Sequence, residues 1–157
     1  MNEFRCPLCA EPLYTNVQGL ACAHGHQFDR AKEGYFNLLP VQKKNSKEPG
    51  DAKAQLQARR QFLEAGFFDP LKNLLLDLIP ATTQTLLDIG CGEGYFTRAL
   101  ATHLVHAQVY GIDIAKAGIR LAAKSAKSNN QSYAVASAFD LPFENRSFDV
   151  VTRVYAP

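Results

Sequence analysis

A glycine-rich loop in the middle of the chain constrains the fold more than any other part of the sequence. An apolar run, 86–89, leads into three glycines at alternate positions, and a helix-like stretch, 95–104, follows them. A strand, a tight glycine loop and a helix in this order bring backbone N–H groups and a helix N-terminus against the negative end of a ligand. The glycines are Gly90, Gly92 and Gly94. The loop therefore predicts a ligand-binding turn in an α/β domain.

Three kinds of ligand site compete for this loop. A P-loop would end in Gly-Lys-Ser/Thr, whereas Gly94 is followed by Tyr95 and Phe96. A dinucleotide fingerprint needs its third glycine at the place that Tyr95 occupies. The tight spacing after Asp88 resembles the first motif of class I S-adenosylmethionine-dependent methyltransferases, and a glycine turn in some other α/β protein is the remaining alternative. The residues assigned to the cofactor here are Asp88, Gly90, Cys91, Gly92, Glu93 and Gly94.

Asp113 stands at the end of the next apolar run, 109–112, which reads as a second strand. In an open parallel sheet, ligands bind outside the carboxyl ends of the strands, where an acidic residue can accept hydrogen bonds from ribose hydroxyls. A helix-like stretch, 115–127, follows, so the alternative role of Asp113 is a helix N-cap. Because the glycine loop lies about twenty residues earlier, we favour ribose binding.

The second half of the chain alternates helices and strands. Asp51 is expected to cap a helix that ends at Gly66, and Asp69-Pro70 begins another that ends at Pro80. One face of the second helix is predicted to be apolar, with Leu71, Leu74, Leu75, Leu78 and Ile79. Strands are predicted at 85–89, 108–112, 132–136 and 148–154. This spacing is typical of βαβ units, so we predict an α/β fold with a parallel sheet.

The first thirty residues carry a metal-ligand pattern. Cys6 and Cys9 are separated by two residues, and Cys22 and His26 by three. Close pairs at the two ends of a short segment allow four ligands to meet around one structural zinc ion, with His24 as the alternative fourth ligand. So short a segment buries too small a core to fold alone, and the metal would supply the missing free energy. Loss of one ligand is expected to unfold this segment only. Unliganded cysteines are the alternative to zinc.

Composition excludes few functions. Of 157 residues, 46% are hydrophobic and 20% charged, which is typical of a globular domain with a small appendage. There is no apolar run of about eighteen residues and no signal-peptide pattern, so no membrane association is expected. Four cysteines, one of them in the glycine loop, do not suit a disulfide framework and favour the cytoplasm. The first 60 residues hold nine Lys/Arg against six Asp/Glu, which suits a polyanionic partner.

The pairing of a zinc module with this glycine loop narrows the family. The segments 28–40, 49–51, 58–60 and 87–95 resemble the bacterial 23S rRNA (guanine-N1)-methyltransferase family, and the resemblance covers essentially the whole chain. It implies 23S rRNA as the partner, S-adenosylmethionine on the loop 90–94 and Asp113 at the ribose. It also implies zinc on Cys6, Cys9, Cys22 and His26. Where the family usually has a tyrosine close to the cofactor, this chain has Phe68.

The chain departs from the class I pattern in the region expected to bind adenine. Many class I methyltransferases place an acidic residue six positions before the Phe of a Leu-Pro-Phe segment, where it contacts the adenine amino group. That segment ends here at Phe143, and the position is Ser137. Asp140 lies nearer the segment and is the alternative contact.

The second departure is length. Class I methyltransferases have seven strands, whereas four are predicted here, in the order 3-2-1-4 that the resemblance implies. We therefore expect a zinc-ribbon-like module at 1–33, a connector at 34–50 and a Rossmann-like methyltransferase domain at 51–157, truncated after its fourth strand. Such a chain is expected to be inactive alone and to dimerise or aggregate through the uncovered strand 148–154.

The implied reaction places defined demands on the chain. The sulfonium methyl group is already activated, so the enzyme positions donor and acceptor and removes a proton from guanine N1. That nitrogen is hidden in a Watson–Crick pair, so the base must be unpaired or flipped. The zinc module and Lys43, Lys44 and Lys47 are expected to grip RNA, with a solvated linker as the alternative. Tyr155 is a candidate for the acceptor pocket, and the general base is unknown.

Three functions are compatible with these patterns. The favoured one is methylation of guanine N1 in 23S rRNA. The second is a small-molecule methyltransferase with an accessory zinc ribbon, because the cofactor half-site does not reveal the acceptor. The third is a non-catalytic RNA-binding fragment with residual cofactor affinity. Salt-sensitive RNA binding separates the first and third from the second.

Overall fold

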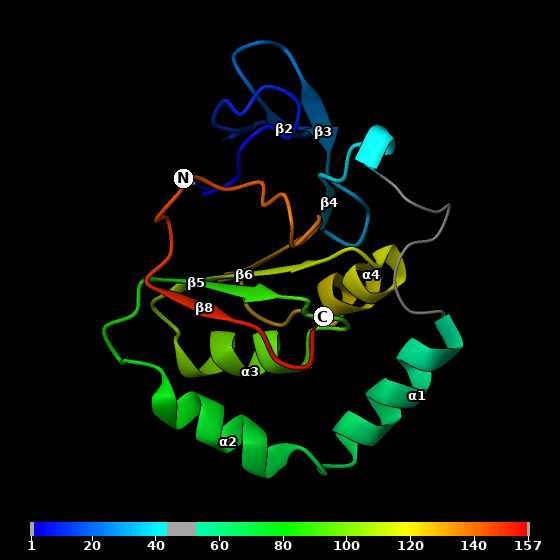
Figure 1. Ribbon diagram of the computed structural model, residues 1–157, viewed down its shortest axis with the longest axis vertical. Helices are drawn as coiled ribbons and strands as arrows, with labels where there is room; N and C mark the ends of the chain where they lie inside the picture. Colours follow the sequence, from blue (N-terminus) through cyan, green and yellow to red (C-terminus); the bar gives the residue numbers. More distant parts are fainter. Residues whose placement is uncertain (1, 44–52, 157) are drawn as a thin grey trace.

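The computed structural model describes residues 2–43 and 53–156, which form two sheets with helices around them (Figure 1). The N-terminal module, residues 2–33, carries an antiparallel sheet in the order β1-β2-β3. The Asn16 side-chain oxygen closes the first turn by accepting hydrogen bonds from the N–H groups of Gln18 and Gly19. Position 19 requires glycine, because a Cβ there would clash with the carbonyl oxygen of Phe28. The strands are β1 (Tyr14–Thr15), β2 (Gly19–Ala21) and β3 (Gln27–Asp29).

The larger sheet has five parallel strands in the order β4-β7-β6-β5-β8. They are β4 (Phe36–Asn37), β5 (Thr85–Ile89), β6 (Gln108–Asp113), β7 (Gln131–Val135) and β8 (Val150–Thr152). The predicted order 3-2-1-4 is confirmed by β7, β6, β5 and β8. β4 is an addition: within the segment predicted as a connector, Phe36 and Asn37 pair with Ala134 and Val135. β4 thereby covers the edge of β7 that the predicted topology left open.

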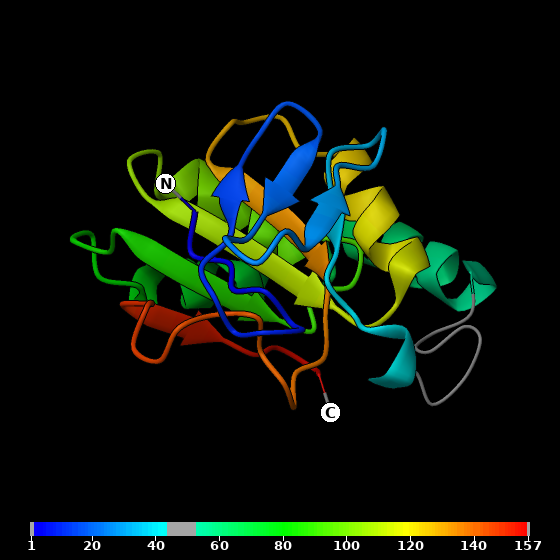
Figure 2. The ribbon, with the colours of Figure 1, turned by 90° about the horizontal axis from the view of Figure 1, so that it is seen from above.

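The helices form layers on one side of the larger sheet, and the N-terminal module lies on the other (Figures 1 and 2). α3 lies against the strands, α2 packs on α3, α4 contacts β6 and β7, and α1 packs on α4. Their bounds are α1 (Lys53–Glu64), α2 (Asp69–Leu78), α3 (Tyr95–His103) and α4 (Lys116–Lys124), with a short 3-10 helix η1 (Val41–Lys43) after β4. The predicted cap Asp51 lies outside the described residues. Within the described part of the chain, no helix is long and apolar enough to cross a membrane.

The apolar face predicted for α2 is only partly buried. Leu75 packs against the core and Ile79 is buried, but Leu74 and Leu78 are 56% and 71% exposed. The reason is position: α2 forms an outer layer and contacts the molecule through a narrow strip along α3 (Figure 1). Periodicity predicted one shared apolar face, and the structure leaves Leu74 and Leu78 of that face exposed.

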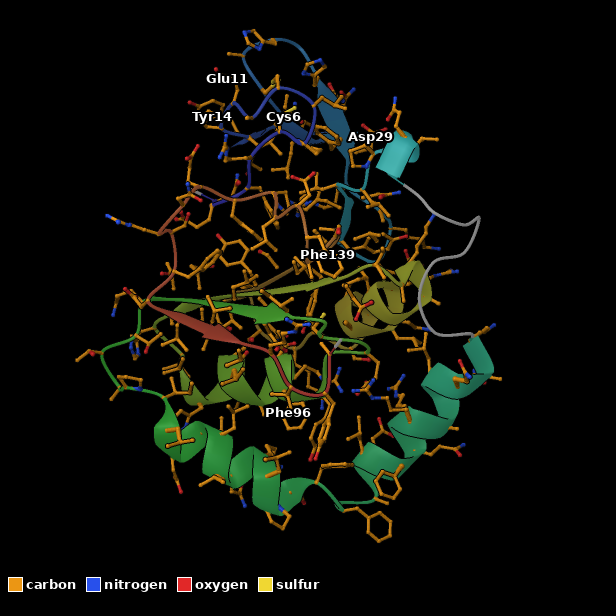
Figure 3. All side chains as sticks on the ribbon, in the orientation of Figure 1. Cys6, Glu11, Tyr14, Asp29, Phe96 and Phe139 are labelled. Carbon is orange, nitrogen blue, oxygen red and sulfur yellow. The ribbon has the colours of Figure 1, made fainter. Side chains whose placement is uncertain are left out.

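The N-terminal module and the larger sheet share one hydrophobic core. Phe4 stacks on Phe143 with centroids 5.1 Å apart and contacts Tyr110 of β6 edge to face at 5.3 Å. The backbone joins as well, since the Arg5 N–H donates to the carbonyl oxygen of Pro142 at 2.8 Å. Figure 3 shows Cys6 above the larger sheet and Phe96 of α3 below it. The shared core includes Phe4, Cys6, Leu13, Leu20, Cys22, Phe36, Leu87, Tyr110, Ile112 and Phe143.

Candidate functional site

The four predicted metal ligands meet in the N-terminal module. The ligand atoms of Cys6, Cys9, Cys22 and His26 all lie within 4.8 Å of one another. The Nδ1 atom of His26 is 3.5 Å from the Sγ of Cys6 and 3.3 Å from that of Cys22, and the Sγ atoms of Cys9 and Cys22 are 3.7 Å apart. Zn–S bonds of about 2.3 Å and Zn–N bonds of about 2.0 Å in a tetrahedron require separations of roughly 3.4–3.8 Å. His24 is exposed and outside the cluster, so the structure selects His26.

Two tight turns bring the ligands together. The Ala10 N–H donates to the carbonyl oxygen of Cys6 at 2.8 Å, and Ala10 adopts a left-handed φ of 63°. In the second turn, the Gly25 N–H donates to the carbonyl oxygen of Cys22 at 3.0 Å, and Gly25 supplies a φ of 83°. The first turn brings Cys9 beside Cys6, and the second brings His26 beside Cys22. The short spacing within each pair in the sequence therefore places both members in the cluster.

The thiols are arranged to lose protons unequally. Although burial opposes ionisation, backbone N–H groups of His26 and His24 and the thiol of Cys9 lower the pKa of Cys22 to about 6. The pKa of the neighbouring Cys9 is raised to about 11. A backbone hydrogen bond from Glu11 lowers this pKa, but burial and the sulfur atoms of Cys6 and Cys22 together raise it by more. Metal binding requires thiolates, so a bound divalent cation would displace the remaining protons.

The glycine loop is anchored to the end of β6. The N–H groups of Gly90 and Cys91 both donate to the carbonyl oxygen of Ile112, at 2.8 and 3.0 Å. The three glycines have φ values of 70°, 56° and 83°, which other residues rarely adopt. A Cβ at Gly92 would meet nothing within 4 Å, so the space beside the loop is open there. This is the geometry expected of a loop whose backbone faces a ligand.

Asp113 and the glycine loop come together as predicted. The Gly92 N–H donates to Asp113 Oδ2 at 2.9 Å, and the Ala115 N–H donates to Oδ1 at 2.8 Å. The second bond orients the carboxylate just before α4, whose N-cap position is Ala115 without a side-chain cap bond, so Asp113 is not the helix N-cap weighed as the alternative. A carboxylate has about four acceptor positions, so both bonds leave room for a hydroxyl group. Ribose binding by Asp113 therefore stays a prediction.

Asp88 lies beneath the loop and is 3% exposed. Its two oxygens accept hydrogen bonds from Thr97 Oγ1 at 2.6 Å and Thr152 Oγ1 at 2.9 Å. Burial, opposed by these two hydroxyl groups and assisted by the charge of Asp113, raises the pKa of Asp88 to about 6. Asp88 thus ties β5, α3 and β8 together under the loop. Its predicted contact with the cofactor stays a prediction.

Two other residues assigned to the cofactor point into the protein. Cys91 Sγ lies under Gly111, where an added Cβ would come within 3.1 Å of it, and burial raises the pKa of the thiol well above its usual value. Glu93 is 2% exposed and its Oε2 is 3.0 Å from Arg98 Nη2. Its Oε1 is buried without a hydrogen-bond partner among the described residues, so one acceptor beneath the loop is unsatisfied.

Phe68 lies in the turn between α1 and α2, beside the glycine loop. Tyr95 Oη donates to Asp69 Oδ1 at 2.6 Å, which holds this turn against the start of α3. Sequence reasoning missed Asp69, Tyr95, Thr97 and Thr152, because their hydrogen-bond partners lie in other elements, 9 to 64 positions away in the chain. The only local signal was the position of Tyr95 directly after the third glycine.

The region expected to bind adenine is a tight turn after β7. Ser137 and Asp140 form an antiparallel bridge, and Ser137 Oγ accepts a hydrogen bond from the Phe139 N–H at 3.2 Å. Phe139 is 94% exposed. The structure therefore brings both candidate residues to one turn beyond β7, and which of them contacts adenine stays a prediction.

Comparison with known proteins identifies the two halves separately. Residues 4–47 match the family model described as "RlmA, N-terminal", a zinc ribbon, and residues 86–156 match one described as "Methyltransferase domain". Among solved structures, a chain from a complex that contains the Haloferax volcanii Trm112 methyltransferase activator matches with a TM-score of 0.56 and 26% identity. That match covers 64% of this chain and 45% of the other.

Curated relatives match both halves at once. "Putative 23S rRNA (guanine-N(1)-)-methyltransferase YxjB" of Bacillus subtilis is 36% identical over 99% of this chain and 57% of its own length. The "23S rRNA (guanine(748)-N(1))-methyltransferase" of Streptomyces fradiae is 31% identical over 100% of this chain and 56% of its own length. The chain thus spans somewhat more than half the length of the curated relatives that it matches.

Fold and site together define a class I methyltransferase domain with a zinc ribbon packed on one face of its sheet. The expected fold class is confirmed. The resemblance to the 23S rRNA (guanine-N1)-methyltransferase family, which the zinc spacing and the segment 31–35 narrowed in the sequence, is confirmed as well.

Proposed function

We propose that this chain provides the cofactor half and the zinc ribbon of an enzyme that methylates guanine N1 in 23S rRNA with S-adenosylmethionine. The observation that carries the proposal is the junction of Gly92 and Asp113. There an open backbone loop and a carboxylate at the end of the next strand face the same side of the sheet. The acceptor in this proposal, guanine N1 of 23S rRNA, is inferred from the names of the curated relatives that match both halves.

The residues present fit S-adenosylmethionine. The open space at Gly92 leaves room for the cofactor. We propose that Asp113 accepts hydrogen bonds from the ribose hydroxyls, and that the ring of Phe68, which contacts Tyr155, lies against the cofactor. A nucleoside triphosphate fits less well, because a lysine at the end of the loop is missing and Asp113 would face its phosphates.

The cofactor supplies an activated methyl group, and the protein supplies position. The glycine loop and Asp113 hold the donor at the carboxyl edge of the sheet, next to Tyr155. Guanine must lose its N1 proton, so the target base is presented unpaired at this edge, where protein groups replace its Watson–Crick partners. The residue that accepts the proton is not assigned.

The zinc ribbon is proposed to contact RNA from the far side of the sheet. In this role the zinc ion on Cys6, Cys9, Cys22 and His26 is structural, because four protein ligands leave no open position. Lys44 and Lys47, also expected to contact RNA, lie outside the described residues. An rRNA substrate places the protein in the cytoplasm. We also propose that the protein forms a homodimer.

Two measurements test this function. Calorimetry with the chain should show binding of S-adenosylmethionine and no binding of ATP or NAD; equal affinity for ATP would refute the cofactor. For the reaction, unmodified 23S rRNA is incubated with the whole protein and tritiated S-adenosylmethionine. Because a methyl group on N1 blocks base pairing, the product stops reverse transcriptase at one guanine. Label without such a stop would refute guanine N1 as the acceptor.

A further inference from the structure

Four aromatic side chains meet at the carboxyl edge of the larger sheet. Phe62 and Phe67 stack with ring centroids 4.7 Å apart and 12° between their planes. Phe68 contacts Phe62 edge to face at 5.5 Å, and Tyr155 contacts Phe68 in the same way at 5.4 Å. Phe62, Phe67 and Tyr155 are 48%, 68% and 67% exposed. We call these four residues the aromatic surface. Contiguous apolar side chains left in water usually mark a binding surface.

The aromatic surface adjoins the methyl-donor site. A Cβ at Gly90 would touch the Cβ of Ala156, the residue after Tyr155, so this end of the chain lies directly on the glycine loop. Tyr155 adopts a left-handed φ of 52°, which is uncommon for a bulky residue and marks a position that its surroundings hold. A base that reaches the glycine loop would therefore have the aromatic surface beside it.

The turn that carries Phe67 and Phe68 is held in place. Asp69 accepts the Tyr95 hydrogen bond at 2.6 Å and pairs with Lys72 at 3.1 Å. The rings are thus presented on a supported turn, which lowers the entropic cost of stacking a partner on them.

The charges around the aromatic surface suit a polyanion. The segment 53–72 holds four cations and two acidic residues. Both acidic side chains are paired, Glu64 with Arg60 at 2.9 Å and Asp69 with Lys72 at 3.1 Å. On its α1–α2 side the surface therefore combines base-sized rings with two more cations than acidic residues over 53–72, the combination with which proteins bind single-stranded nucleic acids. The carboxylates Asp113 and Glu93 lie at its glycine-loop side.

We infer that the aromatic surface binds the unpaired nucleotides that flank the target guanine, with their bases stacked on Phe67 and Tyr155. The inference rests on the proposed function, because guanine N1 is reachable only in an unpaired strand. Stacking accepts every base, since each has a π-face, so this surface adds affinity and orientation rather than sequence preference. A second copy of this chain, packed through the same rings, is the competing occupant.

The first experiment uses the absence of tryptophan from the chain. Phe67→Trp introduces a single indole on the aromatic surface, and its fluorescence is followed during titration with a short unstructured RNA. Stacked bases quench the fluorescence, whereas an oligomer of the same length with abasic sugars, which offers phosphates alone, leaves it unchanged. Equal quenching by both oligomers would overturn the stacking inference.

The second experiment measures RNA affinity by fluorescence anisotropy. Phe67→Ala should weaken binding by roughly 5- to 100-fold, the range for one base stacked on one ring. Phe67→Leu keeps an apolar side chain and should lose nearly as much, because it has no π-face. The matched control is Val105→Ala, since Val105 is 77% exposed but precedes β6 at the opposite edge of the sheet. Binding of S-adenosylmethionine should be unchanged in all three variants, which shows that they fold.

The outcomes separate this inference from the proposed function. If the unchanged chain binds RNA and Phe67→Ala binds it equally well, the aromatic surface is not involved and the proposed function stands. If RNA binds neither the unchanged chain nor the whole protein, the inference and the RNA substrate both fall. If the chain is a dimer in sedimentation and Phe67→Ala converts it to a monomer without changing RNA affinity, the second copy is the occupant.

Discussion

The zinc cluster and the cofactor site are built in opposite ways. All four zinc ligands lie within residues 6–26, and two short turns bring them together. The cofactor site instead needs β5 and β6 side by side, because only then does Asp113 reach the N–H of Gly92. The comparison shows that ligands brought together by short turns can be predicted from their spacing in the sequence. Ligands brought together by a sheet depend on the order of its strands. It also shows that independent construction does not mean independent stability, since the two regions share a core.

The largest expected effect follows from that shared core. Cys9→Ser should release the metal, and the loss should destabilise the larger sheet as well as residues 2–33, because Cys6 and Cys22 pack with Tyr110 and Ile112. This revises the expectation from sequence that only the N-terminal segment would unfold. Structural zinc contributes on the order of 10 kcal/mol in small domains, so one thermal transition at a much lower temperature is expected.

His24→Ala is the matched control for Cys9→Ser, since His24 is exposed and lies two residues from the ligand His26. Metal analysis and circular dichroism follow both variants. Two separate transitions in Cys9→Ser, with the second at the unchanged temperature, would show that the regions are energetically independent after all.

The second-largest expected effect tests the apolar contact between the N-terminal module and the larger sheet. Phe4→Ala removes a ring that is 2% exposed and contacts Phe143 and Tyr110, so it should cost about 3–5 kcal/mol of unfolding free energy. Leu8→Ala is the control in the same module, because Leu8 is 55% exposed, and should change stability by less than about 0.5 kcal/mol. Denaturant titration measures both. Similar losses in the two variants would contradict the shared core.

Asp88 gives a pH-dependent effect on the cofactor half. Its folded pKa of about 6 lies above the ordinary value of 3.8, so the folded state binds the proton more tightly and stability falls as the pH rises from about 4 to about 6. The shift corresponds to a change on the order of 3 kcal/mol. Asp88→Asn should remove this fall, measured as the difference from the unchanged chain at each pH.

The carboxyls with lowered pKa act in the opposite direction from Asp88. Asp149, whose pKa is lowered by the backbone N–H groups of Gln84 and Thr85, contributes stability that is lost as the pH falls below about 4. Asp149 is present in the unchanged chain and in Asp88→Asn, so its contribution cancels from the difference in stability between them. A difference that does not vary between pH 4 and 6 would show that Asp88 has no raised pKa.

The smallest effect concerns the cofactor. Asp113→Ala should weaken binding of S-adenosylmethionine by roughly 1.5–3 kcal/mol, the range for hydrogen bonds to a charged group. Asp77→Ala is the control, because Asp77 is an exposed carboxylate on α2, away from the loop. Calorimetry measures both. Equal affinity in Asp113→Ala would leave Asp113 with its structural bonds to Gly92 and Ala115 only.

Particular residues show where sequence reasoning succeeded and where it could not. His26 was preferred to His24 from the length of the gap, and the structure brings His26 beside the three cysteines, because a short turn depends on local sequence. Periodicity placed Leu74 and Leu78 on the apolar face of α2, but it does not report how much of that face the neighbouring α3 covers. Phe36 and Asn37 carry no strand pattern of their own, and their place in the sheet depends on β7, almost a hundred residues later.

The sequence by itself determined the alternation of helices and strands and the glycine loop, and it predicted the zinc ligands, because each of these patterns lies within one short segment of the chain. Tertiary structure alone decided that Asp88 points at Thr97 and Thr152, that Phe4 joins the N-terminal module to the larger sheet, and that four aromatic rings gather beside the loop. The physical reason is that burial and hydrogen-bond partners are set by which distant segments pack together, and that choice is made by the whole core at once.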